Sequence, residues 1–141
     1  MSNPRNNSFK IPYEKAEDSP GFLLWQTAMC WQRNINHALS KHGLTYTQFI
    51  VLMITGWLQQ NNAKIYQHQV ARSARIDRMM TSRIMSSLEQ KQLIKRAKQS
   101  DDARTNLVTI TPRGEEILIK ALSTSTGMEN DFFEETSKIG P

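Results

Sequence analysis

Apolar residues in the N-terminal third of the chain recur every three or four positions, which is the spacing of one face of an α-helix. Ser19 fits the N-cap and Pro20 the first turn of this helix, and Gly43 fits the turn that ends it. The helix is therefore predicted over about 21–42. The preceding residues 1–18 are polar and interrupted by prolines, so we expect an extended or disordered arm there.

Three further helical segments are predicted between positions 45 and 91. The first begins at Thr45 or Thr47 and fades in the polar run 59–62. Its apolar face is expected to hold Phe49, Leu52, Met53 and Trp57. A short helix and turn follow, with Val70, Ala71, Ala74 and Ile76 as their apolar residues. Asp77 is a good N-cap for the next helix, over about 78–91.

The helix 78–91 has two faces of different character. Met80, Ile84 and Leu88 repeat every four positions and are predicted to be buried. The opposite face is expected to show Arg78, Met79, Ser82, Met85 and Ser86.

Two short strands, about 94–98 and 107–110, follow this helix and are joined by the polar loop 99–106. Two short helices with a tight turn, followed by such a hairpin, form a winged helix-turn-helix, and Ala71 and Ala74 supply the small residues needed where the helices cross. The predicted fold class is therefore mainly α with a small β-hairpin wing (α+β).

The C-terminal quarter is predicted to be helical in two pieces. Thr111 fits an N-cap and Pro112 the first helical position. This helix should run to about Ser123, where the Ser/Thr/Gly-rich stretch 123–127 is expected to break it. A last amphipathic piece lies around Glu129–Ser137.

Basic charge is concentrated in the middle of the chain. The net charge is +5, and residues 68–113 carry ten Lys or Arg against four Asp or Glu, whereas residues 114–141 carry two against six. This distribution is typical of a nucleic-acid-binding surface, although a solvated basic face without a partner has the same composition.

Other classes of protein find little support in the sequence. No run of apolar residues is long enough to span a membrane, and the single cysteine excludes an intrachain disulfide, which favours the cytoplasm. Cys30 lies beside a tryptophan in an apolar helix and is interpreted as a packing residue. The scattered histidines give no metal-ligand spacing, and no phosphate loop or nucleophile–base pair indicates an enzyme or a cofactor.

The helix 78–91 supplies most of the candidate DNA contacts, because the second helix of this motif lies in the major groove. Its arginines can pair with guanine or phosphate, its hydroxyl groups with either, and Met79 with a thymine methyl group. In the loop, the carboxylate of Asp102 can brace Arg104 for entry into the minor groove, although a plain turn with a surface ion pair is the alternative. The candidate DNA-binding residues are Arg78, Met79, Thr81, Ser82, Arg83, Ser86, Lys98, Asp102 and Arg104.

Several of these motifs together resemble the MarR family of bacterial regulators. The matching pieces are Leu44-Thr45-Tyr46-Thr47-Gln48-Phe49, Val70-Ala71 through Ile76-Asp77, Ser82-Arg83 to Leu88-Glu89, Gln92-Leu93-Ile94, Asp102-Ala103-Arg104 and Ile110-Thr111-Pro112-Arg113-Gly114. The resemblance covers about residues 20–133. Gln92 stands where the family usually has glycine, so it must adopt the helix-ending turn that glycine adopts at lower cost.

The resemblance implies a homodimer that binds a near-palindromic operator, and a repressor relieved by a small aromatic or anionic effector. Residues 19–43 would be the first helix of the dimerisation region and 44–111 the winged DNA-binding domain. Residues 112–141 would form C-terminal dimerisation helices that are shorter than usual for the family. A crevice in the family's fold can hold aromatic acids, and its candidate lining residues here are Trp25, Met29 and Tyr46.

Two functional hypotheses therefore stand. The first is a sequence-specific transcription regulator of the kind just described. The second is a winged-helix protein-interaction or small-ligand-binding module without operator binding. Salt-dependent binding to double-stranded DNA distinguishes the two, because phosphate contacts release counterions.

Overall fold

The computed structural model describes residues 5–6 and 8–139 and divides the chain into two compact units, residues 1–33 and 34–141. The first unit holds the arm and the beginning of α1 (Pro20–Leu39). Apart from a 3-10 turn, η1 (Ala16–Asp18), the described residues before α1 form no helix or strand, and residues 1–4 and 7 of the predicted arm lie outside the described ones. Ser19 Oγ accepts a hydrogen bond from the Phe22 backbone N–H at 3.3 Å, so the predicted N-cap is confirmed.

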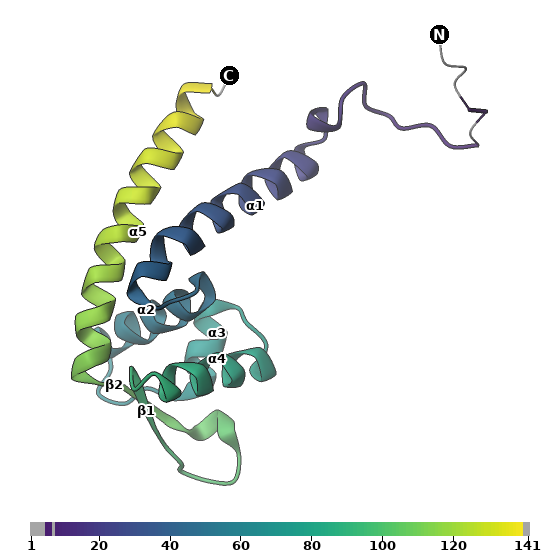
Figure 1. Cartoon of the computed structure of the whole chain (residues 1–141). Coiled ribbons are helices and arrows are strands. Elements are labelled where there is room, and N and C mark those ends of the chain that lie inside the picture. The colour runs from purple at the N-terminus through teal and green to yellow at the C-terminus, as the bar shows by residue number, and fades with distance from the viewer. Residues whose placement is uncertain (1–4, 7, 140–141) are drawn as a thin grey trace. The chain divides into compact units, whose positions relative to one another are not determined.

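The second unit is mostly helical and carries one antiparallel hairpin, as predicted (Figure 1). Its elements are the end of α1, η2 (Ser40–His42), α2 (Tyr46–Asn61), α3 (Gln67–Ala74), α4 (Arg78–Gln90), β1 (Ile94–Ala97), η3 (Ala103–Thr105), β2 (Leu107–Ile110) and α5 (Pro112–Ile139). In the hairpin, Ile94 pairs with Ile110 and Ala97 with Leu107. The hairpin extends beyond the helices of this unit (Figure 1).

Helix α2 lies at the centre of the core of this unit and contacts α3, α4, α5 and β2. Its N-terminus is fixed by a reciprocal pair of hydrogen bonds between Thr45 and Gln48. Its buried residues are Phe49, Val51, Leu52 and Thr55. The prediction that Trp57 shares the buried face is wrong, because this residue lies about 200° around the helix from Thr55 and is 56% exposed.

The buried stripe of α4 is shifted from the predicted one. Ile84 and Leu88 are buried as predicted, but Met80 is 42% exposed, whereas Met85, expected on the outer face, is fully buried. Thr81 is also buried. The reason is that α3, α2 and β1 all pack against α4, so its buried face is wider than a stripe of every fourth residue.

Helix α5 is continuous, so the predicted break at 123–127 is wrong. The Ser/Thr residues of this stretch do not interrupt it: Thr126 Oγ1 donates to the Leu122 carbonyl at 2.7 Å, and Ser125 is buried. Phe132 and Phe133 of the predicted last piece lie on the same helix and form an edge-to-face pair with ring centroids 5.1 Å apart.

Within residues 5–6 and 8–139, three turns use left-handed backbone. Gly43, with φ 73°, ends η2, as predicted for the end of the first helical segment. Gln92, with φ 62°, takes the turn after α4, which confirms the left-handed turn predicted at this position. Arg75, with φ 56°, takes the turn between α3 and α4, which the sequence reading did not predict.

Candidate nucleic-acid interface

The outer face of α4 begins at a well-formed N-cap. Asp77 Oδ1 accepts from the Met80 backbone N–H at 2.8 Å, which fixes the helix start as predicted. Beyond it, the structure exposes four of the predicted DNA contacts and half-buries a fifth, Ser82. The four exposed residues are Arg78, Met79, Arg83 and Ser86, with Met79 69% exposed.

Thr81 does not belong to this face, although the sequence reading included it among the DNA contacts. Its side chain is 1% exposed, and its hydroxyl donates to the Asp77 carbonyl at 2.8 Å. A buried hydroxyl with its hydrogen already used has no access to a groove. Thr81 therefore stabilises the first turn of α4 instead.

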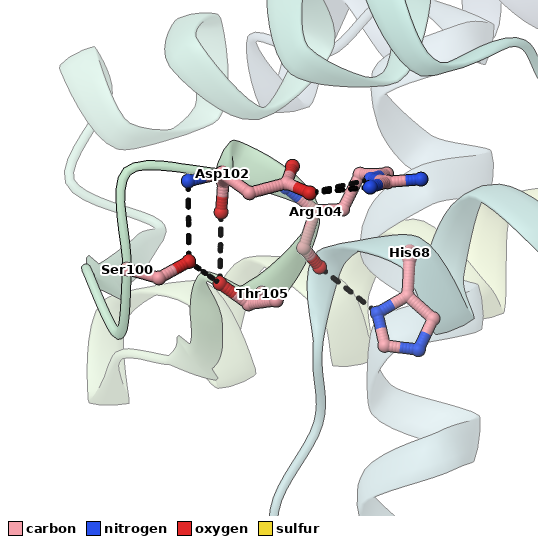
Figure 2. A network of polar contacts seen from close by, with 5 residues as sticks. All are labelled: His68, Ser100, Asp102, Arg104 and Thr105. Carbon is pink, nitrogen blue, oxygen red and sulfur yellow. Dashed lines mark hydrogen bonds and ion pairs between the residues drawn. The ribbon is translucent and has the colours of Figure 1, made fainter.

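The hairpin loop holds Arg104 through Asp102, as predicted (Figure 2). Arg104 Nε donates to Asp102 Oδ2 at 2.8 Å, and Arg104 Nη2 lies 2.5 Å from the same oxygen. Asp102 Oδ1 also accepts from the Arg104 backbone N–H at 3.0 Å. These hydrogen bonds lower the pKa of Asp102 from 3.8 to about 2, so the carboxylate is ionised at neutral pH. They use two of the five N–H groups of the guanidinium and leave the others for a partner.

The same loop is closed on itself and tied to α3. Thr105 Oγ1 donates to the Asp102 carbonyl at 2.8 Å and lies 2.7 Å from Ser100 Oγ. His68 Nδ1, on α3, lies 2.9 Å from the Arg104 carbonyl oxygen (Figure 2). The remaining predicted wing contact, Lys98, is exposed and pairs with Asp101 at 3.5 Å.

A cleft of about 720 Å³ is lined by residues of this loop, of α3 and of the start of α4. The side chains of Arg78 and Arg104, both predicted to contact DNA, line it. The cleft is also lined by Arg72 and Arg75, which the sequence reading missed. The positive charges of α3 and of the turn between α3 and α4 are visible in the sequence, but only the fold shows that this turn faces the wing.

The three predicted pocket residues lie on two helices. Trp25 is 60% exposed and stacks on Phe22, with ring centroids 6.0 Å apart, and Met29 is half-buried. Tyr46 starts α2 and stacks on Phe49 at 6.3 Å. A ligand pocket formed by them stays a prediction. The side chain of Cys30 is half-buried.

Two features are absent from the described part of the chain, a cluster of metal ligands and a membrane-spanning helix. No three His, Cys, Asp or Glu residues there lie close enough to hold a metal ion. No helix there is both long and apolar enough to cross a membrane.

Two short helices with a tight turn, an exposed basic second helix and a hairpin with a braced arginine define a winged helix-turn-helix protein of the DNA-binding kind. The profile of the family described as transcriptional regulator SarA/Rot matches residues 33–121. The chain belongs to this family of transcriptional regulators. It is also 33% identical over 120 residues to the HTH-type transcriptional regulator YdcH of Bacillus subtilis, covering 85% of this chain and 82% of that protein.

Similar solved structures include MarR-family regulators, which confirms the resemblance at the level of the fold. CouR from Rhodococcus jostii RHA1, solved with p-coumaroyl-CoA, has a TM-score of 0.72 and 24% identity, covering 86% of this chain and 83% of that one. MepR from S. aureus, solved in complex with DNA, has a TM-score of 0.72 and 20% identity, covering 84% and 83%.

Proposed function

We propose that this protein binds a near-palindromic operator in double-stranded DNA as a homodimer and represses transcription there. The observation that carries the proposal is the cleft described above. Arg78, at the start of α4, and Arg104, braced in the wing, line the same cleft, so cationic groups from two elements face one region. A DNA duplex presents two grooves with a phosphate backbone between them, which suits this arrangement.

In this mode of binding, α4 lies in the major groove. Its outer face meets the base edges or the flanking phosphates through Arg78, Met79, Ser82, Arg83 and Ser86. Arg104 enters the minor groove, where a narrow groove has enhanced negative potential. Arg72 and Arg75 contact the backbone between the two grooves, and their contacts contribute affinity without sequence preference.

The proposal also includes dimerisation and a response to a small ligand. The terminal helices form the dimer, and its two α4 helices enter successive turns of the major groove, about 34–36 Å apart. A small aromatic or anionic effector, held by Trp25, Met29 and Tyr46, changes that spacing and releases the operator. Repression by DNA binding alone needs no catalysis, and the protein works in the cytoplasm.

The first experiment selects bound sequences from random DNA and measures their affinity at several salt concentrations. The proposal expects a palindromic consensus and a slope of log affinity against log salt of about −0.9 per phosphate contact. Light scattering should give twice the mass of one chain. A folded protein with no salt-dependent DNA binding would favour the alternative, a protein-interaction or ligand-binding module.

The matched variants are Arg104→Ala and Lys120→Ala, which each remove one positive charge. Lys120 is exposed on α5 and pairs there with Glu116 at 3.5 Å. Arg104→Ala should weaken operator binding by about 10- to 100-fold, whereas Lys120→Ala should leave it within about twofold. Equal affinities for the two variants would remove the wing from the mechanism.

A further inference from the structure

Arg96, on β1, is a basic residue that the DNA-binding surface described above does not include. Its side chain is only 14% exposed and is surrounded by acceptors from two helices. Nη1 donates to Gln67 Oε1 on α3 at 3.2 Å, and Nη2 donates to Ser86 Oγ at 2.9 Å and to Glu89 Oε1 at 3.1 Å, both on α4. Both hydrogens of Nη2 are therefore used on one turn of the helix that is proposed to read DNA.

This contact restricts the orientation of the Ser86 hydroxyl. A serine hydroxyl has one hydrogen to donate and two lone pairs that accept, whereas an arginine has no acceptor. Ser86 must therefore be the acceptor in its hydrogen bond with Arg96, and its own hydrogen must point elsewhere. Among the described residues, no atom accepts that hydrogen.

Ser86 is also in the right place to use this free hydrogen on DNA. It is exposed, and it lies three positions after Arg83 and seven after Met79, so it shares the outer face of α4 with them. In the major groove the acceptors on base edges are guanine N7 and O6, adenine N7 and thymine O4. The donors there are the amino groups of adenine and cytosine, and each needs a lone pair on the serine oxygen, of which Arg96 already occupies one.

We propose that Arg96 is a specificity-determining residue that does not itself contact DNA. By donating to Ser86, it occupies one lone pair of this hydroxyl and orients it with its hydrogen toward the major groove, and Ser86 then reads a base acceptor. The inference rests on the proposed function, because it requires α4 to lie in the major groove. Arg96 is thus a positioning residue, and Ser86 makes the contact.

The test uses the full chain and its selected operator, in which each major-groove acceptor is deleted in turn. The analogues are 7-deazapurines for N7, 2-aminopurine for guanine O6 and 5-methyl-2-pyrimidinone for thymine O4. Each half-site should contain one acceptor whose deletion, made alone, weakens binding of the wild-type protein by about fivefold through the loss of the Ser86 hydrogen bond. Ser86→Ala should be insensitive to that same deletion.

Arg96→Gln is compared with Lys95→Gln, its neighbour on β1. Lys95 is exposed and lies on the opposite face of the strand, so both variants lose one positive charge but only one loses the contact with Ser86. The fivefold penalty should disappear in Arg96→Gln and persist in Lys95→Gln. Arg96→Lys should also reduce it, which provides a milder variant if Arg96→Gln folds poorly.

Three results would overturn the inference. In one, Ser86→Ala keeps the penalty, so that Ser86 reads no acceptor. In another, Arg96→Gln and Lys95→Gln both keep the fivefold penalty and weaken binding to intact and acceptor-deleted operators by the same factor. Arg96 would then act only through its charge or through stability. If the wild-type protein binds no DNA at all, the proposed function fails together with the inference, whereas either of the first two results leaves the proposed function intact.

Discussion

Two glycines of α5 give a direct test of how this helix is held against the rest of the second unit. A Cβ atom added at Gly114 would lie 2.0 Å from the Leu93 carbonyl oxygen and 2.8 Å from Ile110 Cγ2. A Cβ added at Gly127 would meet no atom within 4 Å. The same substitution, glycine to alanine, should therefore have opposite effects at the two positions of one helix.

The magnitudes follow from these distances. At Gly114 the contact is 1.0 Å inside the 3.0 Å limit that real Cβ atoms respect, and the obstacle is backbone. The same Leu93 oxygen accepts from the Thr111 N–H at 3.0 Å, so moving α5 away would also weaken that hydrogen bond. Overpacking of this kind costs about 1–3 kcal/mol or more, which exceeds the roughly 1 kcal/mol that alanine gains over glycine in a helix.

At Gly127 only the helix gain remains, because the position is exposed and inside α5. Gly127→Ala should therefore stabilise the protein by up to about 1 kcal/mol, and Gly114→Ala should destabilise it by about 2 kcal/mol. For a chain of this size, 1 kcal/mol corresponds to about 3–4 °C in Tm. The measurement is thermal unfolding followed by circular dichroism, with both variants at the same chain concentration.

A Gly114→Ala variant as stable as the wild type would refute the close approach between α5 and the turn at Leu93. A Gly127→Ala variant with no gain would refute the continuity of α5 and restore the break that its Ser/Thr/Gly composition suggests. The two results are independent, because one concerns the contact of α5 with Leu93 and the other the continuity of α5.

The remaining predictions concern the left-handed turns and the wing. Gln92→Gly should raise stability by about 0.5–1 kcal/mol without changing DNA affinity, because glycine adopts φ 62° without strain. Arg75→Gly should relieve the same kind of strain but weaken DNA binding, because it removes a cationic side chain from the cleft. Thermal unfolding measures the stability of both variants, and titration with DNA measures their affinity. Asp102→Asn should weaken operator binding by releasing Arg104, whereas Asp101→Asn, which also removes one negative charge, should leave it unchanged or strengthen it. Because the pKa of Asp102 is lowered from 3.8 to about 2, the brace is fully present above pH 3.8 and is lost only as the pH falls through about 2. The affinity ratio between wild type and Asp102→Asn should therefore stay constant from pH 7 to pH 5, and a ratio that shrinks toward pH 5 would contradict this account.

The elements whose limits are set by local chemistry could be predicted from the sequence. The N-caps Ser19, Thr45, Asp77 and Thr111 each accept a hydrogen bond from the helix that follows. Such contacts join residues three positions apart, so the sequence contains both partners. The brace between Asp102 and Arg104 was predictable for the same reason, since its partners are two residues apart.

The predictions that failed depend on packing between distant residues. The phase of α4 was misjudged at Met85, because three other elements determine which of its sides is buried. The break predicted in α5 ignored the ability of Ser and Thr to bond to their own helix backbone, as Thr126 does. Arg72 and Arg75 were missed because their part in the cleft depends on the position of a wing about 30 residues further along the chain.

Residue type alone does not separate the side chains that contact a partner from those that hold other side chains in place. Arg96 and Arg104 are eight residues apart on one hairpin. Arg96 donates hydrogen bonds to side chains of α3 and α4, whereas several N–H groups of Arg104 remain available for a partner. Thr81 and Ser82 are neighbours, but one step along α4 turns the side chain by about 100°, which takes one hydroxyl into the core and the other toward the surface. A count of basic and hydroxyl residues locates the DNA-binding segment, whereas the assignment of individual contacts requires the phase of the helix and the hydrogen bonds that each group has already made.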